Sequence, residues 1–124
     1  SARSSTIAMG EQTDLYHYFY RYPNAAFQLP TDFDLGAYHA AEVQFVFGYR
    51  ANPFIRRFNA EEQIMHDLIR NYWGAFVRDG QPRVAGQAEW PKYDAAEDNH
   101  LVLDLEVVTG TGAAAAQCEV WDAL

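Results

Sequence analysis

Apolar positions recur at helical spacing between Asn59 and Gly80. They form one stripe along a helix: Met65, Leu68, Ile69, Tyr72, Trp73 and Phe76. Asn59 is a favourable N-cap, and Glu62 stands three residues later, where it completes a capping box. Gly80, followed by Pro82, ends the pattern. The sequence therefore predicts a helix between these caps, with one face buried against a sheet or another helix.

A period of two marks another element between Asp14 and Tyr22. One face carries only aromatic side chains, and the other is also largely apolar: Tyr16, Tyr18, Tyr20 and Tyr22 against Leu15, His17 and Phe19. Apolar residues on both faces are typical of a strand inside a covered sheet. We expect a strand here, with the aromatic stripe packed in the core rather than stacked on a ligand.

A second alternating run begins at His100 and places Leu101, Leu103 and Leu105 on one face. The residues from Asp94 to Asn99 that precede it are rich in turn formers. The pattern predicts a hairpin between residues 90–93 and 100–105.

The C-terminal part of the chain begins with two glycines and continues with alanines. Gly110 and Gly112 are expected to break the chain, and the alanine-rich segment from Ala113 to Leu124 to form a helix. No internal repeat is present.

The segment from Asp34 to Gly48 combines a loop with candidate chemistry. His39 follows a glycine and precedes Glu42, after which comes an apolar run that ends at Gly48: Val43, Phe45, Val46 and Phe47. This pattern is typical of a loop that presents an imidazole at one point and is anchored by apolar residues behind it. Because the ordinary pKa of histidine lies near neutrality, His39 is a candidate general base. On these residues alone, a structural histidine remains the alternative.

Composition restricts the possible partners. The chain has 124 residues, enough for one small domain, and 49% of them are hydrophobic, but no apolar run is long enough to span a membrane. The net charge of −8 argues against nucleic acid and against anionic membranes, because both would repel the chain. The start without methionine is expected of a processed, excised or tag-derived chain.

Neither a metal nor a cofactor is indicated. The other histidines, His17, His66 and His100, fall in separate elements without zinc-ligand spacing, and no glycine-rich phosphate loop precedes a helix. The single cysteine, Cys118, cannot form a disulfide within the chain. One cysteine is compatible with a cytoplasmic protein or with a secreted one that has a partner chain, so the compartment stays open.

Four motifs occur together in the chain. Gly-x-x-His-x-x-Glu-Val-x-Phe-Val-Phe-Gly surrounds His39, and Tyr-Trp-Gly-Ala-Phe-Val-Arg-Asp-Gly-Gln-Pro ends the predicted helix at Pro82. Trp-Pro-Lys-Tyr covers residues 90–93, and Gln-Cys-Glu-Val-Trp-Asp lies near the C-terminus. In order and spacing they resemble the type-B carboxylesterases, which include cholinesterases and bacterial para-nitrobenzyl esterases, from about Leu15 onward.

The resemblance implies an α/β fold, namely the C-terminal portion of an α/β-hydrolase, with the last strands of the sheet and their covering helices. Residues 1–124 would be one segment, incomplete alone, with a broad apolar face exposed where the rest of the sheet belongs. In eukaryotic relatives the cysteine matching Cys118 is bonded to one upstream, which would lie outside this chain. The helices at 59–80 and 113–124 resemble those that form a homodimer surface in some relatives.

The resemblance also assigns chemistry. His39 would be the histidine of a Ser-Glu-His triad in an ester hydrolase that needs no cofactor. The Gly-x-Ser-x-Gly elbow of the nucleophile is absent, because all serines lie within the first five residues. The family places its acid upstream as well. An N-terminal portion or chain is therefore the expected partner, and a small-molecule ester the expected substrate.

Three neighbours of His39 receive roles by position. Glu42 is interpreted as structural, holding the histidine loop by hydrogen bonds, with an indirect effect on the base as the alternative. Tyr38 and Ala40 flank His39 and are expected to line the substrate pocket, an inference from adjacency.

Two other functions fit parts of the pattern. One is a non-catalytic binding or adhesion module, as some cholinesterase-like proteins are, although His39 in its full setting opposes it. The other is a self-sufficient small domain without enzymatic activity, which the four ordered motifs oppose.

Overall fold

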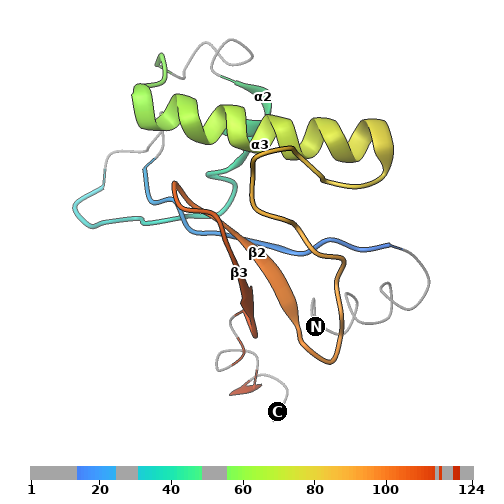
Figure 1. Ribbon diagram of the computed structural model, residues 1–124. Helices are drawn as coiled ribbons and strands as arrows, with labels where there is room; N and C mark the ends of the chain where they lie inside the picture. The colour runs from blue at the N-terminus through green and yellow to red at the C-terminus, as the bar shows by residue number, and fades with distance from the viewer. Residues whose placement is uncertain (1–13, 25–30, 49–55, 114, 116–118, 121–124) are drawn as a thin grey trace.

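The computed structural model describes residues 14–24, 31–48, 56–113, 115 and 119–120. In these residues a long helix lies across one side of a small sheet, as Figure 1 shows. The elements follow in the order β1 (Tyr18–Tyr20), α2 (Val43–Phe47), α3 (Ala60–Asp79), β2 (Asn99–Leu103) and β3 (Val108–Thr111). The expected mixture of helices and strands is confirmed.

The sheet has three strands in the order β1-β2-β3. β1 runs parallel to β2, with Tyr18 opposite Leu101, and β2 runs antiparallel to β3, with Leu101 opposite Thr109. A parallel pair requires a long crossover connection. Here that connection contains α2 and α3, which is why the histidine segment lies beside the sheet.

The predicted caps of α3 are confirmed at both ends. The Asn59 side chain accepts a hydrogen bond from the Glu62 backbone N–H at 2.9 Å, and the Glu62 carboxylate accepts one from the Asn59 N–H at 2.8 Å. At the other end Gly80 adopts a left-handed conformation (φ 71°), and its N–H donates to the Phe76 carbonyl. Local hydrogen bonds therefore set the length of this helix.

Glu62 also joins α3 to the chain that precedes it. Its side chain is fully buried, and its two oxygens accept hydrogen bonds from the Arg56 guanidinium at 2.7 and 2.8 Å. The hydrogen bonds to Glu62 are the main cause that raises the pKa of Arg56. This two-pronged, charge-assisted contact compensates the buried carboxylate and holds the first turn of α3 in place.

The core lies between α3 and the sheet. Its fully or nearly fully buried side chains come from α3, from β2 and from the flanking segments: Met65, Leu68, Ile69 and Tyr72; Leu101 and Leu103; Tyr22, Phe45 and Trp90. The predicted helical stripe is thus confirmed, except that Phe76, near the end of α3, is 45% exposed.

β1 is shorter than the alternation predicts, and only one of its faces is well covered. Tyr18 packs edge-on against Trp73 and Trp90, with ring centroids 5.2 and 5.9 Å apart, so the aromatic stripe belongs to the core as expected. On the opposite face Phe19 is 43% exposed. Among the described residues this second face is only partly covered. The expectation of a strand buried on both faces depends on neighbours outside this chain and stays a prediction.

The predicted hairpin is wrong. Residues 90–93 form no strand and bond to the segment that precedes β1 instead: the Tyr93 N–H donates to the Leu15 carbonyl at 2.7 Å, and the Trp90 indole donates to the His17 carbonyl at 2.9 Å. The hairpin consists of β2 and β3.

Gly110, expected to break the chain, lies inside β3 opposite His100. A Cβ at this position would lie 2.7 Å from His100 Nε2, so glycine leaves the space that the imidazole occupies.

Most of the predicted C-terminal helix lies outside the described residues, and so does Cys118. Exposed large apolar side chains occur on α2, α3, the strands and the loops. In the described part of the chain, no helix is long and apolar enough to cross a membrane.

Two histidines face each other on the side of the sheet away from α3. The ring centroids of His17 and His100 are 6.0 Å apart. The Nδ1 atoms of both are buried with no hydrogen-bond partner among the described residues. Burial and, to a smaller degree, the charge of His100 lower the pKa of His17, whereas Asp98 opposes the shift. The folded protein therefore favours a neutral His17.

This arrangement predicts a loss of stability in mild acid. An unfolded chain has an ordinary histidine pKa of about 6.5 and binds more protons than the folded one below that pH. The contribution of neutral His17 to the free energy of unfolding is therefore complete above about pH 6.5. It is lost as the pH falls from there through the lowered pKa of His17. Urea unfolding at pH 7.5 and 5.0 measures it, and His17→Gln should reduce the pH dependence, whereas His39→Gln, at an exposed position, should retain it. Equal pH dependence in the wild type and His17→Gln would contradict this account.

Candidate functional site

His39 lies in a tight turn formed by residues 38–41. The Ala41 N–H donates to the Tyr38 carbonyl at 3.1 Å, which closes the turn around His39 and Ala40. Ala40, the third residue, has a φ of 65°, and a positive φ at this position is what a type II turn requires. The His39 side chain is exposed, so the turn presents the imidazole to the surroundings.

The backbone of Ala40 is strained. A non-glycine residue in the left-handed region costs about 1–2 kcal/mol relative to the right-handed one. Such residues persist where the surrounding structure holds them, and they concentrate at functional sites. The approach to the turn is also ordered, because the Gly36 N–H donates to the Asp34 carboxylate at 2.8 Å and its carbonyl accepts from the Tyr38 N–H.

The predicted apolar anchor behind His39 lies in the helix α2 and is confirmed for Phe45, with Val46 partly buried. The other two residues of the apolar run, Val43 and Phe47, are exposed. Phe45 is fully buried. Its ring packs against those of Tyr22 and Phe58, with centroid distances of 5.8 and 5.3 Å. His66 Nδ1 on α3 donates to the Phe45 carbonyl at 2.7 Å. Gly48 ends α2 with a φ of 79°, and a Cβ there would lie 3.1 Å from His66 Cε1. α2 is thus fixed directly to α3.

Glu42 connects the histidine turn to β1. It is the N-cap residue of α2, and its carboxylate accepts a hydrogen bond from the Tyr18 hydroxyl. Burial, followed by the charge and hydrogen bond of Glu42, raises the pKa of Tyr18. Among the described residues, no hydrogen bond joins Glu42 to His39. This geometry supports the structural interpretation of Glu42.

Gln44 belongs to the same site and was not among the predicted residues. Its side-chain amide donates to the Ala41 carbonyl at 3.0 Å and is also hydrogen bonded to the Tyr38 hydroxyl. The one signal in the sequence is a polar residue inside the apolar run that precedes Gly48.

Tyr38 and Ala40 flank His39, but no described cavity includes them. Tyr38 is partly buried and Ala40 is exposed. Burial raises the pKa of Tyr38, and the hydrogen bond with Gln44 partly offsets that effect. A substrate-lining role for these two residues stays a prediction.

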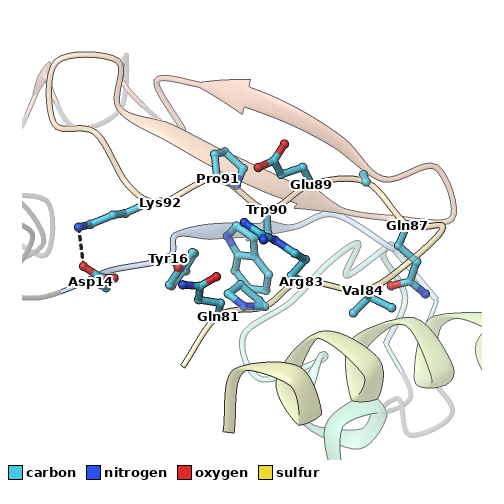
Figure 2. Close-up of a pocket in the computed structure, with 12 residues that line it drawn as sticks. Asp14, Tyr16, Gln81, Arg83, Val84, Gln87, Glu89, Trp90, Pro91 and Lys92 are labelled. Carbon is cyan, nitrogen blue, oxygen red and sulfur yellow. Dashed lines mark ion pairs between the residues drawn. The ribbon is translucent and has the colours of Figure 1, made fainter. Parts of the chain in front are cut away.

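A cavity of about 540 Å³ lies elsewhere, between the segment that precedes β1 and the segment after α3. Figure 2 shows its lining, which includes Asp14, Arg83, Glu89, Trp90 and Lys92. The Lys92 ammonium forms an ion pair with Asp14, whose carboxylate raises the pKa of Lys92. None of its lining residues belongs to the His39 turn, so it is not the candidate site.

The described residues contain no group of three or more His, Cys, Asp or Glu side chains arranged to hold a metal ion. The side chain at the centre of the candidate site is the exposed imidazole of His39, a group that can act as a general base.

The chain is similar in sequence to known proteins. A sequence model of the Carboxylesterase family matches residues 2–121. Acetylcholinesterase from Danio rerio is 31% identical over 114 residues, and carboxylesterase 5A from Mus musculus is 30% identical over 114 residues. These matches cover 85% and 86% of this chain but only 18% and 19% of the relatives, so the chain spans about a fifth of their length.

Solved structures show the same fold. A PNB esterase matches 90% of this chain and 22% of its own, with a TM-score of 0.70 and 20% sequence identity. Because PNB esterases are α/β-hydrolases, the three-stranded sheet and its helices are part of an α/β-hydrolase fold. With nearly its whole length matched by the family's sequence model, the chain belongs to the Carboxylesterase family.

Proposed function

We propose that this chain supplies the general base, His39, to a serine hydrolase of carboxylic esters. The rest of the site, a serine nucleophile and an acid, comes from an N-terminal portion or chain. The observation that carries the proposal is the presentation of an exposed imidazole on a turn with a strained Ala40, supported from behind by the buried Phe45.

In the proposed reaction His39 accepts the proton of the serine hydroxyl as the serine oxygen bonds to the ester carbonyl carbon. The tetrahedral intermediate collapses, the bond to the alcohol breaks, and His39 returns the proton to the leaving alcohol. A water molecule then attacks the acyl-enzyme, giving its proton to His39. The serine recovers that proton when the carboxylic acid leaves. No cofactor takes part.

The surroundings of His39 agree with a site completed from elsewhere. A triad histidine needs a carboxylate on one ring nitrogen and a serine on the other. Glu42, the nearest carboxylate in sequence, is bonded to Tyr18. The imidazole of His39 is exposed, so groups from another part of the protein can reach its nitrogens. The relatives are about five times as long as this chain, and their remaining length would supply such groups.

The first experiment is a native mass of the purified protein, followed by denaturing mass spectrometry and labelling with a fluorophosphonate, which reacts with activated serines. We expect the chain to be joined to, or to accompany, a polypeptide with a labelled Gly-x-Ser-x-Gly serine. A well-folded, unlabelled species at 14.1 kDa without hydrolysis of para-nitrophenyl esters would overturn the proposal. That result would favour a binding or structural module.

A further inference from the structure

Gln44 places a buried amide inside the apolar run of α2. Its side chain is only 7% exposed, between the exposed Val43 and the fully buried Phe45. A buried amide destabilises a protein unless its hydrogen bonds are made. The partners of this amide therefore show what the residue does at this position.

Two hydrogen-bond partners of this amide belong to the histidine turn, residues 38–41. The Gln44 Nε2 atom donates to the Ala41 carbonyl at 3.0 Å, after the turn, and the amide is hydrogen bonded to the hydroxyl of Tyr38, before the turn. One side chain of α2 thus bridges the two residues that enclose His39 and Ala40. The backbone bond from the Ala41 N–H to the Tyr38 carbonyl closes the same turn.

From these contacts we propose that Gln44 is a positioning residue for His39. The inference rests on the proposed function, because it concerns the direction of the catalytic imidazole. With Ala40 at a φ of 65°, the turn is in a conformation that most residues avoid.

Gln44 holds Tyr38 and Ala41, the two ends of this turn, at their observed places. The buried Phe45 and the bond from His66 fix α2 to the core. Gln44 therefore holds the turn that carries His39 at a fixed place relative to the core. A displacement of about 1 Å in a catalytic group can reduce a rate by about 100-fold.

The test is Gln44→Met, which retains the length of the side chain and removes both hydrogen bonds. In the enzyme that contains the chain and its nucleophile, kcat should fall by about 10- to 100-fold, with KM unchanged within about twofold. The rate of serine labelling by the fluorophosphonate should fall by the same factor. The matched control is Gln63→Met on α3. The exposed amide of Gln63 bonds to Asp67, away from the histidine turn, and its loss should leave kcat unchanged.

A role limited to stability predicts a different pattern. In that case Gln44→Met would lower the unfolding temperature but leave kcat per folded molecule unchanged, which would overturn the inference. Tyr38→Phe, which removes the hydrogen bond between the Tyr38 hydroxyl and Gln44, provides a milder variant if Gln44→Met does not fold, and it should reduce kcat by a smaller factor.

Rescue gives a second readout. Glycine adopts a positive φ without strain, so Ala40→Gly should restore part of kcat in the Gln44→Met background. No rescue would count against the positioning role.

His39→Ala, measured in parallel, separates the two proposals. If His39→Ala remains active, the proposed function fails. If His39→Ala is inactive and Gln44→Met has the wild-type kcat, only the inference about Gln44 fails.

Discussion

Replacing His39 with alanine should abolish ester turnover without unfolding the protein. We expect kcat to fall at least about 1,000-fold, because the serine loses the base that accepts its proton and the leaving alcohol loses its acid. The unfolding temperature should stay the same, since the His39 side chain is exposed. Hydrolysis of para-nitrophenyl acetate and a thermal melt on the same sample measure both quantities.

Glu42→Gln provides the comparison on the same loop. It weakens the hydrogen bond with Tyr18, so we expect lower stability and a partial loss of activity. Abolition of turnover by Glu42→Gln with folding intact would instead identify Glu42 as the acid of the triad. Retention of more than about a tenth of kcat by His39→Ala would remove His39 from the general-base role.

Replacing Phe45 with alanine should lower the free energy of unfolding by about 3–5 kcal/mol, the usual cost of deleting a buried phenylalanine ring. Phe45 is fully buried, and its ring contacts Tyr22 and Phe58, so its removal leaves a cavity between α2 and the core. Urea unfolding monitored by tryptophan fluorescence measures the change.

The matched control lies two residues further along the same helix. Phe47 is 70% exposed, and Phe47→Ala should change the free energy of unfolding by no more than about 0.5 kcal/mol. Equal costs for the two substitutions would contradict the assignment of Phe45 as the buried anchor. Because α2 supports the histidine turn, Phe45→Ala should also reduce kcat. The same variant should thus show both a lower free energy of unfolding and a lower kcat.

Predictions from the sequence succeeded where the determining interactions are local. The ends of α3 could be predicted because Asn59, Glu62 and Gly80 form their capping hydrogen bonds with residues at most four positions away. The apolar anchor after His39 was equally visible, since Phe45 and its neighbours adjoin the histidine in the chain. The family resemblance is now established by the match over residues 2–121.

The failures concern pairing between distant segments. Alternating patterns in residues 90–105 do not reveal that the Tyr93 backbone bonds to Leu15, or that β2 takes β1 and β3 as its neighbours. Gly110 resembles a chain break in the sequence, whereas in the sheet it provides the space for His100.

The sequence by itself therefore determined the family, the capped helix α3 and the histidine with its apolar anchor, because each depends on residues adjacent in the chain or on their order. Only the tertiary structure decided that Glu42 bonds to Tyr18, that Ala40 is left-handed and that Gln44 bridges Tyr38 and Ala41. Hydrogen-bond partners and backbone strain depend on where packing places each group. Packing is a property of the whole fold, which no single stretch of the chain contains.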